Sequence, residues 1–361
     1  MQESSKKEAS KRVNEIDALR FLAACSVVIF HYAFQGYASG HSVLAYPLLV
    51  PVAKYGYLGV ELFFMISGFV ILMTASSGRL RRFTISRIVR LYPAFWACCT
   101  ITFLFEIGIG TESTTISFGQ YLANMTMLSQ FARIAPVDPV YWTLAIEMQF
   151  YALVAVVLVF KKIEKAQLFL TIWLLATIVL DVHQSKWLRF FLIAQYAPFF
   201  IGGAVAFIIW SRGITLARLG LMVLAFLLSV YHSLLDIHHL VKAYNTPYCN
   251  HVVIGIVTVF FCVMLLIATR YTGWFGNQNW SPIGVLTYPL YLIHYVVGMI
   301  ILNRLSPLAN PHVILWGTVL AMLAVSWVVH IYVEQKIAGH LKKALGITFD
   351  FFSKRKAELT L

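Results

Sequence analysis

An arginine and a histidine lie in the first long hydrophobic run of the chain, IDALRFLAACSVVIFHYAF (16–34). Arg20 stands near the start of this run, and His31 lies eleven residues later, deep within it. On a helix of 3.6 residues per turn, a step of eleven residues returns to almost the same face, about 16 Å further along the axis. Ionisable groups inside a membrane span are costly and usually face a bundle interior or a wet cavity. The run therefore predicts one wall of a site, with Arg20 and His31 at different depths.

Two acidic residues fall in other hydrophobic runs. Glu61 belongs to GYLGVELFFMISGFVI, which also contains Ser67, and Glu147 belongs to YWTLAIEMQFY. A carboxylate inside a membrane must be paired, protonated or solvated. We expect both carboxylates at a depth similar to that of His31. Two acids and a histidine at one level predict an acid/base site or a proton path.

A fourth run, SPIGVLTYPLYLIHYVVG, places Tyr288, Tyr291 and His294 on one side of a helix, with His294 near mid-membrane. A single histidine in a span often serves only as an interhelical hydrogen-bond partner, but two at matched depth weaken that alternative. Trp142 and its aromatic neighbours allow two interpretations. They form either an aromatic belt at the membrane interface or part of the site.

The segment GRLRRFTISRIVRLYP carries a cluster of arginines. They are Arg79, Arg81, Arg82, Arg87 and Arg90. Arg87 and Arg90 are three residues apart, so on a helix they share one face. Guanidinium groups bind phosphates bidentately, which indicates a nucleotide-like ligand. The alternative is that the segment is basic only because it is a cytoplasmic loop. Pro93 predicts a break where the segment enters the next span.

Composition sets the class of protein. The chain has 361 residues, of which 60% are hydrophobic and only 12% charged. Soluble domains average about 25% charged residues, so the composition indicates a polytopic membrane protein. The net charge of +13 belongs to residues that flank membrane spans, and we expect no nucleic-acid partner. The five cysteines form neither a disulfide framework nor a metal-binding spacing, and we expect no metal.

Apolar runs long enough to cross about 30 Å of hydrocarbon predict an all-α fold with about ten transmembrane helices. The predicted spans are 16–34, 57–74, 91–107, 141–160, 166–181, 188–210, 216–235, 252–269, 283–302 and 313–333. Residues 118–128 are too short to cross and predict an interfacial or re-entrant piece. Gly56, Gly59 and Gly68 have the common use of glycine in a span, which is to let helices approach closely.

Lysines and arginines predict the orientation. With a cytoplasmic N-terminus, the outside loops hold only six of the 28 basic residues, namely Lys54, Arg133, Lys186, Arg189, Lys242 and Arg304. This asymmetry follows the positive-inside rule, and an even number of spans places both termini in the cytoplasm. We expect a cytoplasmic tail at 1–15, one membrane domain at 16–335, and a basic amphipathic tail at 336–361 that forms a helix on the membrane surface.

Five segments together resemble the membrane-bound acyltransferase-3 family of bacterial O-acyltransferases. They are IDALRFLAACSVVIFH, GVELFFMISGF, RIVRLYP, WTLAIEMQFY and TYPLYLIH, in this order along residues 16–335. The resemblance implies that Arg20 and His31 form the functional pair and that Arg87 and Arg90 handle an acyl-CoA donor. The chain departs from the family pattern at Thr287, where serine is commoner. It also departs at Glu334, which lacks the proline that often follows. Some relatives append an extracytoplasmic hydrolase-like domain, which we do not expect here.

The resemblance implies transfer of an acyl group, most simply acetyl, from cytoplasmic acyl-CoA to a hydroxyl of a cell-surface or lipid-linked carbohydrate. The enzyme would be a multi-pass protein of the cell membrane, the inner membrane in a bacterium. We expect His31 to deprotonate the hydroxyl, with Glu61 or Glu147 holding its imidazole. A covalent acyl-histidine remains an alternative to direct attack. The expected substrate pocket comprises Ser67, Trp142, Tyr288, Tyr291 and His294.

Two other functions remain open on the residues alone. Buried carboxylates and histidines also suit a proton-coupled transporter or a flippase for a lipid-linked sugar. A sensor or scaffold leaves the five segments unexplained. Nothing names the acceptor sugar, for which we expect outer loops 35–56, 108–140 and 236–251 to set specificity. The oligomeric state is also left open.

Overall fold

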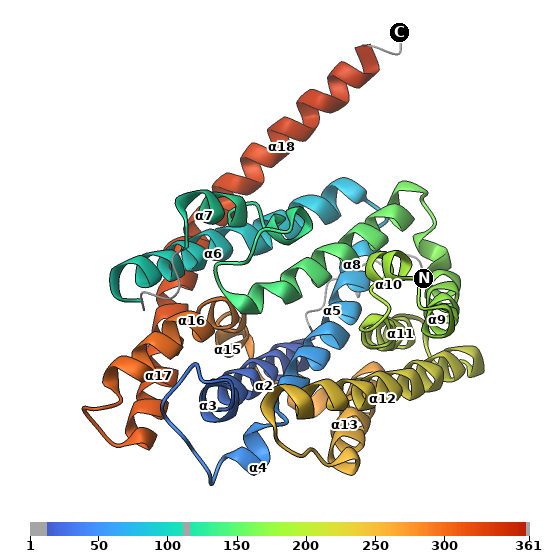
Figure 1. Cartoon of the computed structure of the whole chain (residues 1–361). Helices are drawn as coiled ribbons and strands as arrows, with labels where there is room; N and C mark the ends of the chain where they lie inside the picture. Colours follow the sequence, from blue (N-terminus) through green and yellow to red (C-terminus); the bar gives the residue numbers. More distant parts are fainter. Residues whose placement is uncertain (1–12, 111–115, 359–361) are drawn as a thin grey trace.

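The computed structural model describes residues 13–110 and 116–358, with side chains to residue 348, and all its regular structure in these ranges is helical (Figure 1). Nine of the described helical segments are long and apolar enough to cross a membrane. They are Asn14–Ala38, Val50–Ala75, Leu80–Ile109, Pro139–Val159, Ile163–His183, Leu216–Tyr244, Asn250–Ala268, Ser281–Leu305 and Pro311–Thr348. The prediction of an all-α, polytopic membrane protein is confirmed, while the orientation of the termini stays a prediction.

The helices carry the labels of Figure 1, and some of them lie between the nine long segments. The first half of the chain forms α2 (Asn14–Phe30), α3 (Gly36–Ala38), α4 (Val50–Ala53), α5 (Gly59–Ala75), α6 (Leu80–Ile109), α7 (Phe118–Asn124), α8 (Trp142–Val159) and α9 (Ala166–His183). The second half forms α10 (Lys186–Phe191), α11 (Ala197–Arg212), α12 (Leu216–Tyr244), α13 (Asn250–Ala268), α14 (Gly273–Gly276), α15 (Ser281–Gly284), α16 (Thr287–Leu305), α17 (Pro311–Val329) and α18 (Gln335–Glu358).

The predicted sixth span, 188–210, is not one helix. It divides into α10 and α11, separated by a turn in which Ile193 has a left-handed φ of 53°. With 16 residues, α11 is about 24 Å long, shorter than a hydrocarbon core of about 30 Å. Every residue from Ala197 to Ile209 is buried. The prediction of one continuous helix over 188–210 is therefore wrong, because its apolar part is a short helix enclosed by its neighbours.

Glycines allow α5 to pack closely on both α2 and α11. A Cβ added at Gly56, just before α5, would overlap the carbonyl oxygen of Ser26 in α2. A Cβ at Gly68 would overlap the carbonyl oxygen of Phe200, and one at Gly203 would overlap that of Met65. The close-approach role predicted for glycines in this span is confirmed, and the packing fixes the position of Ser67 beside Gly68.

Two predicted boundaries are absent from the described helices. Helix α6 runs from Leu80 to Ile109 with Pro93 inside it, so the predicted break before the third span is wrong. A proline in a membrane helix is tolerated where neighbouring groups satisfy the backbone carbonyl that it leaves free. Likewise α17 continues into α18 through a π-helical turn, His330–Glu334. Arg87 and Arg90 therefore stand on a rigid helix rather than in a loop.

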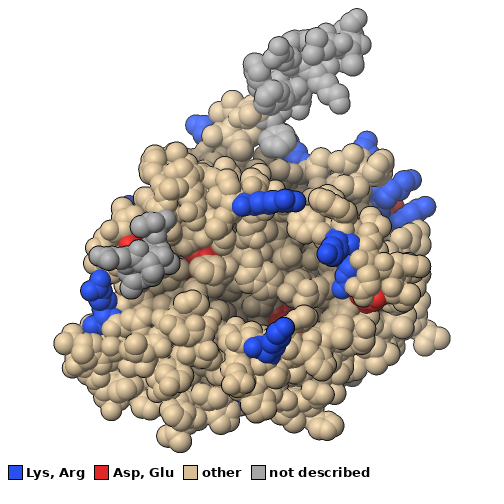
Figure 2. All heavy atoms as spheres, in the orientation of Figure 1, with Lys and Arg blue, Asp and Glu red and all other residues tan. Residues whose placement is uncertain are grey.

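The surface of the face seen in Figure 2 consists mostly of uncharged residues, and its lysines and arginines are scattered rather than gathered into one patch. The same view shows a hollow near the centre of this face. A largely uncharged surface suits a protein embedded in lipid.

Candidate active site

A pocket lies among α2, α5, α6, α8 and α16, with about 800 Å³ of space free of protein atoms when its open mouth is included. We call it the arginine pocket. Its lining consists of Arg20, Val60, Phe63, Phe64, Ser67, Ile71, Arg87, Arg90, Leu91, Thr143, Leu144, Glu147, Tyr151, Thr287, Tyr288 and Tyr291. Its lining thus comes from five helices that are distant in the sequence, and it includes several of the residues that the sequence analysis identified.

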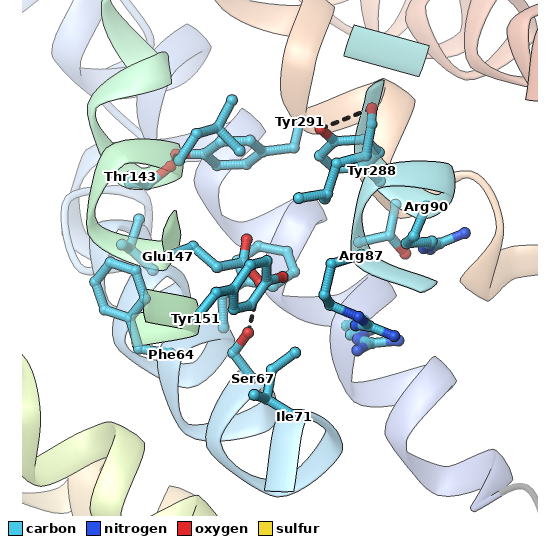
Figure 3. A pocket seen from close by; sticks show the side chains of 16 residues that line it. Phe64, Ser67, Ile71, Arg87, Arg90, Thr143, Glu147, Tyr151, Tyr288 and Tyr291 are labelled. Carbon is cyan, nitrogen blue, oxygen red and sulfur yellow. Dashed lines mark hydrogen bonds between the residues drawn. The ribbon is translucent and has the colours of Figure 1, made fainter. Parts of the chain in front are cut away.

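Glu147 is the carboxylate of this pocket, and two hydroxyls hold it in place (Figure 3). Its Oε1 accepts a hydrogen bond of 2.6 Å from the Ser67 hydroxyl and one of 2.5 Å from the Tyr151 hydroxyl. Hydrogen bonds to an ionised carboxylate are among the stronger ones in proteins. Glu147 therefore connects α8 to α5 beside the arginine pocket.

Three arginines face the same pocket. Arg20 lies 3.9 Å from the Asp17 carboxylate and is close enough to Arg90, Glu147 and Arg87 to interact with them electrostatically. The Nε atom of Arg87 is buried without a hydrogen-bond partner among the described residues. Figure 3 shows Arg87 and Arg90 across the pocket from Glu147. Three guanidinium groups outnumber the carboxylates that balance them, so the pocket favours an anionic ligand.

His31 lies outside the lining of the arginine pocket and pairs with His294. The ring centroids of the two histidines are 5.2 Å apart, and the ring of Tyr295 lies 4.6 Å from that of His31. His31 begins a π-helical turn, His31–Gln35, that interrupts the regular helix after α2. Such turns are rare and occur frequently at functional sites. The two histidines that the sequence places at matched depth thus lie beside each other in the structure.

A second pocket lies beyond this histidine pair, with about 1980 Å³ of space including its open mouth. We call it the Asn303 pocket. Its lining consists of Gly40, His41, Glu106, Ile109, Ile116, Gln120, Pro136, Val137, Pro139, Tyr295, Val296, Met299, Ile300, Asn303 and Arg304.

The order of residues along two helices places the histidines between the pockets. On α16, Tyr288 and Tyr291 line the arginine pocket, and His294 follows. Six residues further along, Tyr295, Val296, Met299, Ile300, Asn303 and Arg304, line the Asn303 pocket. On the chain through α2, Arg20 lines the first pocket, His31 follows, and His41 lines the second. The predicted arrangement of Arg20 and His31 along one wall agrees with this geometry.

The partner of His31 differs from the sequence prediction. Its Nδ1 lies 3.2 Å from Oε1 of Gln35, and no carboxylate is bonded to it in the described structure. Glu147 instead lies at the arginine end of the bundle, so its predicted depth beside His31 is wrong. The reason is that the turn leading into α8 is held inside the bundle, where the buried Asp138 accepts a hydrogen bond from the backbone N–H of Val296. Counting depth from a helix start assumes that every helix starts at the membrane boundary.

Glu61 is buried, and its Oε2 has no hydrogen-bond partner among the described residues. It is absent from the lining of both pockets. Its carboxyl lies close enough to Asp236 for the two acids to interact. Among the described residues, no hydrogen bond joins Glu61 to His31, so no contact supports the predicted role of Glu61 in holding the imidazole.

The five residues expected to line a substrate pocket divide into two groups. Ser67, Tyr288 and Tyr291 line the arginine pocket. The Tyr291 hydroxyl lies 2.8 Å from that of Thr143, and the Tyr288 hydroxyl donates to the carbonyl oxygen of Leu91. His294 lies between the pockets, whereas Trp142 is 37% exposed and packs against Tyr196 outside them.

Two residues at the histidine pair were absent from the sequence prediction. Gln35 follows His31 by four residues, a spacing that brings side chains together on a helix and was available in the sequence. Asp138 is fully buried and precedes Pro139 at a helix start, a common position for a capping aspartate. Its approach to Val296 joins distant parts of the chain and left no local signal.

Comparisons with known proteins identify the family of the chain. A family profile described as "Acyltransferase domain" matches residues 13–331. Peptidoglycan O-acetyltransferase OatA of Listeria monocytogenes serovar 1/2a is 30% identical over 173 residues, which are 42% of this chain and 25% of that protein. O-acetyltransferase OatA of Staphylococcus aureus strain NCTC 8325 is 32% identical over 164 residues, which are 40% of this chain and 24% of that protein. No solved structure matches the chain.

The match to these relatives spans about a quarter of their length, whereas the family profile spans most of this chain. The region that the family profile matches contains both pockets and the histidine pair between them. The chain belongs to the acyltransferase-3 family and is a multi-pass membrane protein.

Proposed function

We propose that this acyltransferase moves an acyl group, acetyl in the simplest case, from acyl-CoA at the arginine pocket to a carbohydrate or glycolipid hydroxyl at the Asn303 pocket. One observation carries the proposal. Along α16 and α2, a cationic pocket, a histidine pair and a second pocket follow one another in this order. Family membership favours acyl transfer over the transporter or flippase alternative.

The donor end is assigned by charge. CoA carries its phosphates at one end and its thioester at the end of a long flexible arm. Arg20, Arg87 and Arg90 supply guanidinium groups that suit phosphate, and the predicted orientation places them at the cytoplasmic side, where acyl-CoA is made. The thioester would then extend along α16 toward His31.

The reaction needs one base and balances without a further reagent. The acceptor hydroxyl oxygen attacks the thioester carbonyl carbon, and His31 takes the hydroxyl proton as the C–O bond forms. The tetrahedral intermediate then expels the CoA sulfur, the C–S bond breaks, and the proton passes from His31 to the thiolate. The products are an ester and free CoA thiol.

The acceptor end is assigned by the names of the relatives and by the lining of the second pocket. The Listeria relative is named as a peptidoglycan O-acetyltransferase, which supports a carbohydrate acceptor here. The Asn303 pocket combines apolar side chains with the polar groups of His41, Asn303 and Arg304. Such a mixture suits a sugar, which presents hydroxyls at its edge and C–H groups on its faces.

The test uses purified protein in lipid nanodiscs with radiolabelled acetyl-CoA and a panel of oligosaccharides and glycolipids. We expect release of CoA thiol together with a labelled, alkali-labile ester on one acceptor. His31→Ala should abolish both signals, whereas His251→Ala, which removes an exposed histidine at the start of α13, should not.

Two results would overturn the proposal. One is unchanged transfer by folded His31→Ala protein. The other is movement of a glycolipid across a sealed vesicle membrane without any release of CoA, which would favour the flippase alternative.

A further inference from the structure

The hydrogen bonds around Gln35 define which nitrogen of His31 carries a proton. The Ser39 hydroxyl donates to the carbonyl oxygen of Gln35 at 2.7 Å. A backbone carbonyl can only accept, so the single proton of Ser39 is committed there. The Ser39 oxygen must therefore accept from its other two partners, which are the Gln35 amide and Nδ1 of His41, 2.8 Å away.

The side-chain amide of Gln35 is oriented by this constraint. The Gln35 atom that lies 3.0 Å from the Ser39 oxygen must be a donor, which identifies it as Nε2. The same Nε2 lies 3.2 Å from the Tyr295 hydroxyl. The other amide atom, Oε1, therefore faces Nδ1 of His31 at 3.2 Å.

An amide oxygen has no proton to give, so Nδ1 of His31 must be the donor. In the neutral imidazole the lone pair then belongs to Nε2. No hydrogen bond occupies this Nε2 within the described part of the chain. We infer that Gln35 is a positioning residue that holds His31 in the Nδ1–H tautomer, with Nε2 as the base. The part of this inference that concerns catalysis rests on the proposed function.

The fold supports this role in two further ways. His31 and Gln35 are the first and last residues of one π-helical turn, and their side chains lie within hydrogen-bonding distance of each other. Gln35 is buried, so water does not compete for its amide. A neutral amide also differs from the carboxylate of a hydrolytic triad, since it fixes the tautomer without stabilising an imidazolium by charge.

The tautomer itself can be measured without activity. Protein labelled with 15N-histidine would be examined by NMR, with the His31 signals identified by their loss in His31→Ala. We expect a protonated Nδ1 and an unprotonated Nε2 in the native protein, and a mixture of tautomers in Gln35→Leu. A native His31 with the proton on Nε2 would overturn the inference, whatever the outcome for the proposed function.

Catalytic variants then test the consequence. Gln35→Leu should lower kcat about 10- to 100-fold and leave the KM for acetyl-CoA unchanged, because the arginine pocket is untouched. Gln35→Glu should retain much of kcat, because a carboxylate oxygen can accept the same hydrogen bond from Nδ1–H of His31. Gln167→Leu, at a half-buried glutamine on α9, is the matched control and should change neither.

The Ser39→Ala variant tests whether the Ser39 hydroxyl orients the Gln35 amide, and it should cause a smaller fall in kcat than Gln35→Leu. Equal kcat in Gln35→Leu and the native enzyme, or a Gln35→Glu variant no more active than Gln35→Leu, would refute the positioning role.

Discussion

The rings of His31 and His294 lie 5.2 Å apart, but different groups orient them. Nδ1 of His294 lies 2.8 Å from the carbonyl oxygen of Tyr291 in its own helix, and its Nε2 is buried without a partner among the described residues. His31 is held by the Gln35 side chain and lies next to Tyr295 at the edge of the Asn303 pocket. The pair thus combines one histidine fixed by main chain with one fixed by side chains.

This difference predicts unequal costs of substitution. His31→Ala should lower kcat by about 100-fold or more, the usual contribution of a general base. His294→Asn should cost less than about tenfold, because the asparagine amide can still donate to the Tyr291 carbonyl oxygen. The measurement is kcat at saturating acetyl-CoA and acceptor, alongside thermal unfolding in detergent. A larger loss for His294→Asn than for His31→Ala would assign the base to His294.

The arginine pocket predicts a defect in donor binding. Removing a guanidinium that bonds a phosphate costs about 1.5–3 kcal/mol, so Arg87→Ala should raise the KM for acetyl-CoA by roughly tenfold or more. Arg87→Lys should recover only part of this, since an ammonium cannot bind bidentately. The matched control is Arg270→Ala, because that arginine lies over the Trp210 ring away from both pockets.

These donor variants should leave the acceptor KM unchanged. If Arg87→Ala and Arg270→Ala had the same donor KM as the native enzyme, the pocket would not be the phosphate site.

The bond from Ser67 to Glu147 predicts a loss of stability. Ser67→Ala removes a hydrogen bond to a half-buried carboxylate, and we expect a cost of about 1.5–3 kcal/mol. Ser229 is the matched control, because its buried hydroxyl has no partner among the described residues. Ser229→Ala should be neutral or slightly stabilising. Denaturant unfolding of the two variants compares them directly, and equal stabilities would show that Glu147 does not depend on Ser67.

How much of the site the sequence predicts depends on whether the determining contacts are local. Helical periodicity places Arg20 and His31 on one wall because both belong to one helix. It also predicts the shared face of Tyr288 and Tyr291. It fails for Glu147, because the level of α8 is set by the contact of Asp138 with Val296, far along the chain.

The fold shows the same division. Nine of ten spans follow from hydrophobic runs, since a span must be long and apolar whatever surrounds it. The remaining predicted span, 188–210, is not one helix, because a turn at Ile193 divides it and the short α11 is enclosed by protein. The π-helical turn at His31 likewise has no local composition signal in HYAFQ.

The contact between α5 and α11 predicts a graded series of glycine variants. Gly203→Ala would drive a Cβ into the carbonyl oxygen of Met65, which cannot move without shifting α5, and should cost at least about 1–3 kcal/mol or prevent folding. Gly202→Ala would meet the Phe261 ring at 2.8 Å, and this ring can rotate, so the loss should be smaller. Gly220→Ala, which has open space, should lie within about 0.5 kcal/mol of the native protein. Thermal unfolding should rank the three in this order, and a Gly203→Ala protein as stable as Gly220→Ala would contradict the packing.

The Asn303 pocket predicts a defect confined to the acceptor. Ile300→Trp would place an indole in this pocket, beyond the histidine pair from the arginines, and the acceptor KM should rise about tenfold or more while the donor KM stays constant. Val313→Trp is the control, because Val313 is 65% exposed on α17 and lines neither pocket. Both constants come from initial rates of CoA thiol release with one substrate varied at a time. A rise in the donor KM alone would assign the second pocket to acyl-CoA. If donor and acceptor enter from opposite ends of α16, substitutions at one end of this helix should change only the donor KM, and substitutions at the other end only the acceptor KM.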